Sequence, residues 1–197
     1  MARIFYVVRL KGVIGDCLNA IRVFANPAVK HSAHITVRGP YEKEIEIGPT
    51  NAVVSEASLV IKGVGRFSNL AGGDVIYFAC EGLDFARVWW KPDYPAFVPH
   101  VTVYHGSDRK WAEWIYRIAS KHPFCLSYRV DSLETLIAGQ EGGDAAPVLF
   151  DEEMISRIAG EDARKIKSLP ALHRLGAIDR VCRYLVALSD STESPRI

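Results

Sequence analysis

Two short stretches of the sequence pair a histidine with a threonine two residues later. They are His34–Val37, which reads HITV, and His100–Val103, which reads HVTV. Imidazole titrates near neutral pH, so one histidine can accept a proton while the other donates one. Threonine hydroxyls can donate hydrogen bonds to phosphate oxygens, on which negative charge accumulates during cleavage. The two tetrads together predict cleavage of a phosphodiester bond without a metal.

Strand geometry places the reactive side chains of each tetrad on one face. Successive side chains of a β-strand point to opposite faces, so a histidine and a threonine two residues apart point the same way. His34 and Thr36 therefore share a face, as do His100 and Thr102, while the apolar residues between them pack inward. We expect the histidines to be the catalytic pair and the threonines to bind phosphate.

The same alternation, continued by one residue, adds two candidates for substrate binding. Arg38 follows the first tetrad and can bind a phosphate through two parallel hydrogen bonds. A surface or structural ion pair is the alternative role for this arginine. Tyr104 follows the second tetrad and can stack on a base or donate its hydroxyl group.

Histidines near the tetrads raise the alternative of a metal site, because histidine is a common zinc ligand. His31 and His105 flank the tetrads. However, His31 lies three residues from His34, which on one strand puts the two side chains on opposite faces. We therefore expect no metal and no other cofactor. A metal-dependent hydrolase remains the alternative, and it predicts that EDTA abolishes activity.

The tetrads require a sheet to hold them, and the sequence predicts one interrupted by helices. Runs of β-branched and aromatic residues predict strands over residues 3–9, 33–37, 58–67, 75–80, 98–104, 124–130 and 133–138. Helical spacing predicts helices over residues 12–25, 151–159 and 171–188, with a shorter piece over 164–168. A further helix is expected between Asp108, which can cap it, and Pro123, which ends it. Residues 42–48 are expected to form an edge strand or a loop, and residues 81–98 mostly a loop.

Aromatic residues outside the tetrads are expected to serve mainly the core. Asp108 can cap a helix whose apolar stripe comprises Trp111, Trp114, Ile115, Ile118 and Ala119. Trp89, Trp90 and Phe97 lie in the segment before the second tetrad, and we expect them first of all to pack in the core. The alternative is that they form a lid that stacks on a base.

Composition bounds the class of protein. The chain has 197 residues, of which 49% are apolar and 24% charged, as in an ordinary globular domain. No apolar run approaches the roughly 20 residues of a membrane span, so no membrane is expected.

The net charge and the cysteines suggest the partner and the compartment. Proteins that bind long duplex nucleic acid usually carry a surplus of basic residues, which a net charge of +1 does not provide. A nucleotide or an RNA end is therefore the expected partner. Four scattered cysteines suggest reduced thiols and a cytoplasmic location.

The two tetrads resemble the signature of the 2H phosphoesterase superfamily, which includes bacterial RNA 2′,3′-cyclic phosphodiesterases and 2′-5′ RNA ligases. The segment Pro99–Thr102 is particularly similar to the second motif of that family, and the resemblance covers residues 1–150. It implies an α+β fold in which two pseudo-symmetric lobes of antiparallel sheet surround a central cleft. It also implies catalytic roles for His34 and His100 and phosphate-binding roles for Thr36 and Thr102.

The chain departs from the family pattern in three places. The helix expected before the second motif is not evident in residues 81–99, and Tyr104-His105 stands where ligase-like members carry an arginine. Ligase activity is therefore not implied. Residues 151–197 form a helical extension beyond the minimal domain, expected to dock on the sheet or, as the second choice, to form a homodimer.

The expected function is hydrolysis of a 2′,3′-cyclic or 2′-5′ phosphodiester of RNA or a nucleotide. Two alternatives use the same site. One is a phosphodiesterase for cyclic oligonucleotide messengers, and the other is a non-catalytic module that binds nucleotides or RNA ends.

Overall fold

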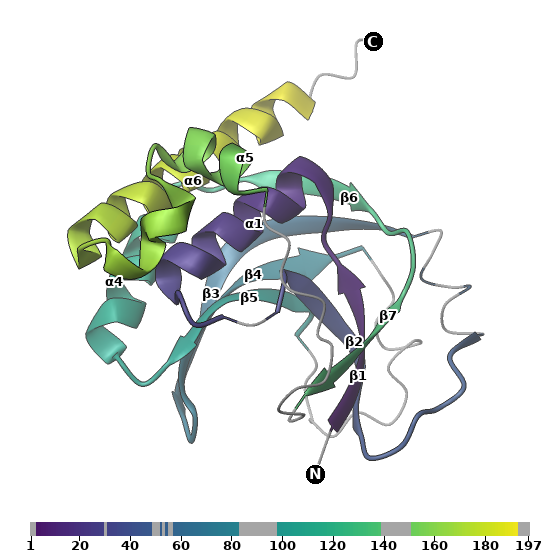
Figure 1. The fold of residues 1–197 in the computed structure, drawn as a ribbon. Helices are drawn as coiled ribbons and strands as arrows, with labels where there is room; N and C mark the ends of the chain where they lie inside the picture. The colour runs from purple at the N-terminus through teal and green to yellow at the C-terminus, as the bar shows by residue number, and fades with distance from the viewer. Residues whose placement is uncertain are drawn as a thin grey trace.

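A seven-stranded antiparallel sheet with helices on one face forms the framework (Figure 1). The computed structural model describes residues 3–29, 31–48, 52, 54, 57–82, 98–138 and 151–192. Its strands are β1 (Arg3–Arg9), β2 (His34–Tyr41), β3 (Ser58–Leu70), β4 (Gly73–Glu81), β5 (His100–Gly106), β6 (Cys125–Arg129) and β7 (Glu134–Ala138). Its helices are α1 (Gly12–Ala25), α4 (Arg109–Ser120), α5 (Glu152–Ala159), the 3-10 helix η1 (Ala163–Ser168) and α6 (Ala171–Thr192). The α+β class expected from the sequence is confirmed.

The sheet consists of two groups of strands that meet at a narrow seam. Its order is β6-β3-β4-β5-β2-β1-β7, and every neighbouring pair is antiparallel. Pairing between β2 and β5 is short, with Ile35 opposite Val101. In Figure 1, β1, β2 and β7 run steeply across the direction of β3, β4 and β5. The two tetrads therefore lie on the two strands that form the seam.

Most predicted elements are present, and capping residues mark where the helices begin. The Asp108 side chain accepts a hydrogen bond from the backbone N–H of Trp111 (2.9 Å) and caps α4. Asp151 caps α5 in the same way. The hairpin of β3 and β4 is longer than predicted and turns at residues 71–72. Residues 42–47 form a loop rather than an edge strand. Residues 83–97, with Trp89, Trp90 and Phe97, lie outside the described residues.

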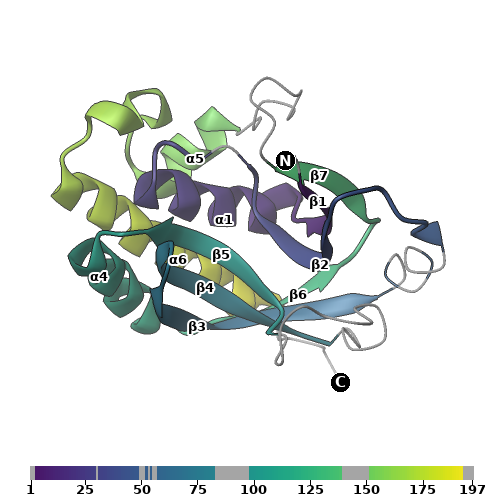
Figure 2. The same cartoon turned by 90° about the horizontal axis from the view of Figure 1, so that it is seen from below.

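One hydrophobic core joins the helices to the sheet. Helix α1 packs against β5 on one side and against α5 and α6 on the other (Figure 2). Its apolar stripe is fully buried together with apolar residues of α6, namely Cys17, Leu18, Ile21, Phe24, Ile178, Val181 and Leu185. The C-terminal helices therefore dock on α1 and share the core of the sheet.

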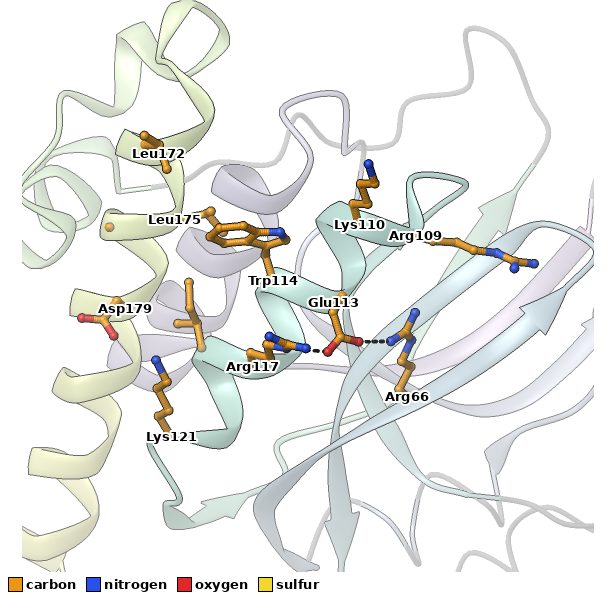
Figure 3. A pocket seen from close by; sticks show the side chains of 12 residues that line it. Arg66, Arg109, Lys110, Glu113, Trp114, Arg117, Lys121, Leu172, Leu175 and Asp179 are labelled. Carbon is orange, nitrogen blue, oxygen red and sulfur yellow. Dashed lines mark hydrogen bonds and ion pairs between the residues drawn. The ribbon is translucent and has the colours of Figure 1, made fainter.

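One residue of the predicted stripe on α4 is not in the core. Ala112, Ile115 and Ala119 are buried, whereas the Trp114 side chain is 53% exposed. Trp114 lies at the edge of the stripe and faces a groove between α4 and α6 (Figure 3). The expectation that Trp114 is buried was wrong, because α4 presents only a narrow face to the sheet.

The described helices include none that is both long and apolar enough to cross a membrane.

Candidate active site

The seam brings the four tetrad side chains together on one face of the sheet. Because Ile35 lies opposite Val101 in an antiparallel pair, His34 lies opposite Thr102 and Thr36 lies opposite His100. Each histidine is thus the neighbour of the other tetrad's threonine. The two histidines occupy diagonal positions of this pair, and diagonal neighbours typically lie about 7–8 Å apart, with their Cβ atoms somewhat closer.

Burial follows the predicted alternation within both tetrads. Ile35, Val37, Val101 and Val103 belong to the hydrophobic core and are at most 2% exposed. The histidines and threonines between them are partly exposed, on the face away from the helices. The expected sharing of faces is confirmed.

Both imidazole rings are held by the same type of backbone hydrogen bond. Nδ1 of His34 lies 2.7 Å from the Ser32 carbonyl oxygen, and Nδ1 of His100 lies 2.6 Å from the Val98 carbonyl oxygen. A carbonyl oxygen can only accept, so Nδ1 carries the proton in each ring. Each histidine therefore leaves Nε2 as the nitrogen that can exchange a proton with a substrate.

The surroundings lower the pKa of both histidines, and of His34 more strongly. Burial, with the charges of Arg22, His31 and Arg9, lowers the pKa of His34 to about 4, against the opposing effect of the Ser32 carbonyl. Burial also lowers the pKa of His100 from its ordinary value. Both rings are consequently neutral at pH 7 in the free protein.

A buried arginine connects the second tetrad with the segment that precedes the first tetrad. Arg22 projects from α1, and its guanidinium donates hydrogen bonds to the carbonyl oxygens of Thr102 and of His31, the latter at 3.0 Å. Burial lowers its pKa to about 10, so the group stays charged at neutral pH. Arg22 is not among the site residues predicted from the sequence. An arginine beside Ile21, within the buried stripe of α1, was the signal that could have drawn attention to it.

A β-bulge follows directly after the threonine of each tetrad. In such a bulge, two residues of the motif strand lie opposite one residue of the neighbouring strand. In β2, Thr36 pairs with Val7 but Arg38 pairs with Tyr6. In β5, the shift falls in the same place, immediately after the threonine. A bulge changes which face the following residues occupy. Simple alternation predicted that Arg38 and Tyr104 share a face with the histidine and threonine of their tetrads, and each bulge ends this alternation before it reaches them.

Tyr104 lies on the helix-covered face, so its predicted place in the site was wrong. It pairs with the core residue Ile76 and is 7% exposed within the hydrophobic core. Its hydroxyl lies 3.5 Å from the Asp108 carbonyl oxygen at the start of α4. The bulge puts the exposed His105, which pairs with Val75, on the face of the tetrads instead.

Arg38 also does not lie on the face of the sheet that was predicted for it, the face of His34 and Thr36. The side chain is buried, with 5% exposure, and its Nε donates to the hydroxyl of Tyr41 (3.3 Å). The guanidinium lies 5.8 Å from the centroid of the same ring. The structure therefore places Arg38 with Tyr6 and Tyr41, and its predicted position beside Thr36 was wrong.

Charged side chains lie on the β1 side of the tetrads. Arg9 is opposite His34, and its Nη1 donates to the Ser32 hydroxyl at 2.7 Å. Its Nε forms an ion pair with Glu134 at 2.5 Å, which Lys11 also contacts at 3.0 Å. This group of two cations and one carboxylate carries a net positive charge. It is the cationic end of the site.

Aromatic side chains lie on the β4 side of the tetrads. Tyr77 lies opposite Thr102, and its ring centroid is 5.0 Å from that of His100. Phe67 of β3 stacks on Tyr77, with centroids 4.4 Å apart. Neither residue was predicted from the sequence, because only the pairing of β3, β4 and β5 brings them beside the second tetrad.

A cavity of about 710 Å³ lies elsewhere, between α4 and α6 (Figure 3). Its rim is cationic, while Glu113 at its wall is bonded to Arg66 and Arg117, each at 2.6 Å. None of the tetrad residues lines it. The cavity opens on the helix side of the sheet, away from the histidines.

The part of the chain that the structure describes contains no group of three or more histidine, cysteine, aspartate or glutamate side chains arranged to hold a metal ion.

Comparison of the sequence with known proteins gives no assignment: no family model matches the chain, and no curated protein matches it significantly.

Proposed function

We propose that the protein is a metal-independent phosphodiesterase of the 2H type, which hydrolyses a 2′,3′-cyclic or 2′-5′ phosphodiester of RNA or a nucleotide. The observation that carries the proposal is the diagonal pair of histidines. Each has Nδ1 fixed on a backbone carbonyl, Nε2 left for proton exchange, and a threonine hydroxyl opposite. General acid–base cleavage of a phosphodiester requires these groups.

In the proposed mechanism, His34 is the base and His100 is the acid. Nε2 of His34 accepts a proton from water as the water oxygen bonds to phosphorus. The bond from phosphorus to the ribose oxygen breaks, and protonated His100 donates its Nε2 proton to that oxygen. Thr36 and Thr102 donate hydrogen bonds to the non-bridging oxygens. The proton gained by His34 and the proton lost by His100 balance, and exchange with solvent restores both.

The charge distribution supports this division of roles. Arg9 and Arg22 lie near His34, and their positive charges oppose protonation of its ring, so His34 stays available as a base. His100 is instead in contact with the uncharged rings of Phe67 and Tyr77. A bound phosphate monoanion between the histidines favours the protonated form of His100, which the acid step requires.

The arrangement of the strands supports two pseudo-symmetric lobes around a central cleft. One group of strands, β2-β1-β7, carries the first tetrad, and the other, β6-β3-β4-β5, carries the second. Each motif strand bulges directly after its threonine and pairs with the other at the seam. This correspondence between the halves is what a bilobal 2H fold predicts.

The test is turnover of a substrate panel in excess EDTA, comprising 2′,3′-cyclic nucleotides, 2′-5′ dinucleotides and cyclic dinucleotides. Hydrolysis of at least one of them is the expected result, and the preferred compound separates RNA ends from cyclic messengers. Binding of the same compounds without turnover would replace the proposal with a non-catalytic module. Loss of activity in EDTA, restored by zinc, would replace it with a metal-dependent hydrolase.

A further inference from the structure

Three aromatic rings meet on the second-tetrad side of the site. Phe67 stacks on Tyr77 with an angle of 26° between the ring planes. The His100 ring contacts both, edge-on to Phe67 at 5.4 Å and tilted against Tyr77 at 5.0 Å. Phe67 and Tyr77 are both partly exposed. They form an aromatic platform whose edge is the imidazole that we propose as the acid.

A glycine makes the platform possible. Gly65 pairs with Tyr77 across β3 and β4. A Cβ atom at position 65 would lie 2.3 Å from Cζ of the Tyr77 ring, closer than any side chain can approach. Glycine weakens the interior of a strand and often marks a close approach. Here it allows the Tyr77 ring to lie across β3, within reach of Phe67.

The two ends of the site differ in chemistry. Among the described residues, the aromatic ring contacts made by the tetrads all involve His100. At the other end, Arg9 lies opposite His34 and is paired with Glu134. The site is therefore apolar and planar beside the proposed acid, and charged beside the proposed base.

We infer that Phe67 and Tyr77 bind the nucleobase of the substrate, so that a nucleoside phosphate binds with its base on the His100 side. This inference rests on the proposed function. His100 protonates the ribose oxygen that leaves phosphorus, and the ribose that carries this oxygen also carries a base. The base must then lie on the His100 side of the phosphate, where the platform is. Stacking on aromatic rings tolerates every base, because each base has a π face.

The test compares two substrates that share the reacting group. One is 2′,3′-cyclic AMP, and the other is methyl ribofuranoside 2,3-cyclic phosphate, which lacks a base. Stacking is worth about 1–3 kcal/mol per base, which is about 5- to 150-fold, so we expect kcat/KM of the wild-type protein to favour the nucleotide by a factor in that range. Equal values for the two substrates would overturn the inference without any variant.

Single-residue variants show which side chains cause the preference for the nucleotide over the substrate without a base. Phe67→Leu keeps an apolar side chain but removes the ring, and we expect it to bring the ratio of the two kcat/KM values close to one. Tyr77→Phe keeps both rings, and the preference should persist. Trp114→Leu, which removes an exposed ring from α4, is the matched control and should leave the ratio unchanged. A preference that survives Phe67→Leu would contradict the role of the platform.

A binding measurement keeps the inference separate from catalysis. By calorimetry, adenosine 2′-monophosphate should bind the wild-type protein more tightly than inorganic phosphate, and Phe67→Leu should reduce this difference. That result would support the platform even if no cyclic phosphate were hydrolysed, in which case only the proposed reaction fails. Equal affinity for both ligands in a protein that hydrolyses cyclic nucleotides would overturn the platform alone.

Discussion

Ile35 lies opposite Val101 across the seam, and this antiparallel register puts each proposed acid–base group beside a hydroxyl from the other tetrad, His34 beside Thr102 and His100 beside Thr36. The site is therefore assembled across the two motif strands rather than within either one. A change that alters the pairing of β2 and β5 would separate both His–Thr neighbours at once. This arrangement makes the geometry of the seam as important to function as the identities of the four residues.

Loss of either histidine should abolish most of the turnover. We expect His34→Ala and His100→Ala each to lower kcat by about 10²-fold or more, the usual scale for loss of a general acid or base. Thr36→Val and Thr102→Val should lower kcat/KM by weakening phosphate stabilisation. Thr135→Val, at an exposed position of β7, is the matched control. Circular dichroism should show unchanged folding, and full activity of both histidine variants would refute the mechanism.

The rate should be highest at acidic pH. The base must be unprotonated, and His34 with a pKa of about 4 meets this condition at any higher pH. The acid must be protonated, and His100 in the free protein has a pKa below its ordinary value of 6.5. We expect kcat/KM to rise with pH through about 4 and to fall again before pH 6.5. A maximum above pH 7.5 would contradict the lowered pKa values of the two histidines.

Arg22 should act as a positioning residue that also lowers the pKa of His34. Arg22→Leu removes the guanidinium that donates hydrogen bonds to the carbonyl oxygens of Thr102 and His31, which we expect to cost about 1–3 kcal/mol of unfolding free energy. It also removes a nearby positive charge, so the pKa of His34 should rise and the acidic limb of the rate profile should move to higher pH. Chemical denaturation and NMR titration of His34 measure the two effects.

The matched control for Arg22 is Arg174. This arginine of α6 lies over the Trp111 ring, with its guanidinium 4.7 Å from the ring centroid, away from the tetrads. Arg174→Leu should lower stability without moving the His34 titration. If both variants leave the pKa of His34 in place, Arg22 serves only the packing of α1 beneath the seam.

Much of the fold was predictable because local signals agree with the final packing. The strand over residues 3–9 and the helix over residues 12–25 have the predicted bounds, and Asp108 caps α4 as expected. The tetrad faces were predictable from side-chain alternation alone. The bulges were not, since they depend on how β2 pairs with β1 and how β5 pairs with β4. Phe67 and Tyr77 were missed for the same reason: their contact with His100 arises from strand pairing, which one strand's sequence does not encode.

The bulge after the second tetrad leads to a prediction for Tyr104 that differs from the one simple alternation gives. If Tyr104 shared a face with His100 and Thr102, loss of its hydroxyl would raise KM for a nucleotide substrate. Because its ring is in the core and its hydroxyl makes only a long contact with the Asp108 carbonyl oxygen, we expect Tyr104→Phe to leave kcat and KM within about twofold of wild type. Its stability should change by less than about 1 kcal/mol. Steady-state kinetics of this variant beside Thr102→Val, two residues earlier on the same strand, shows where the reactive face ends. A KM raised as much in Tyr104→Phe as in Thr102→Val would mean that the tyrosine reaches the substrate after all.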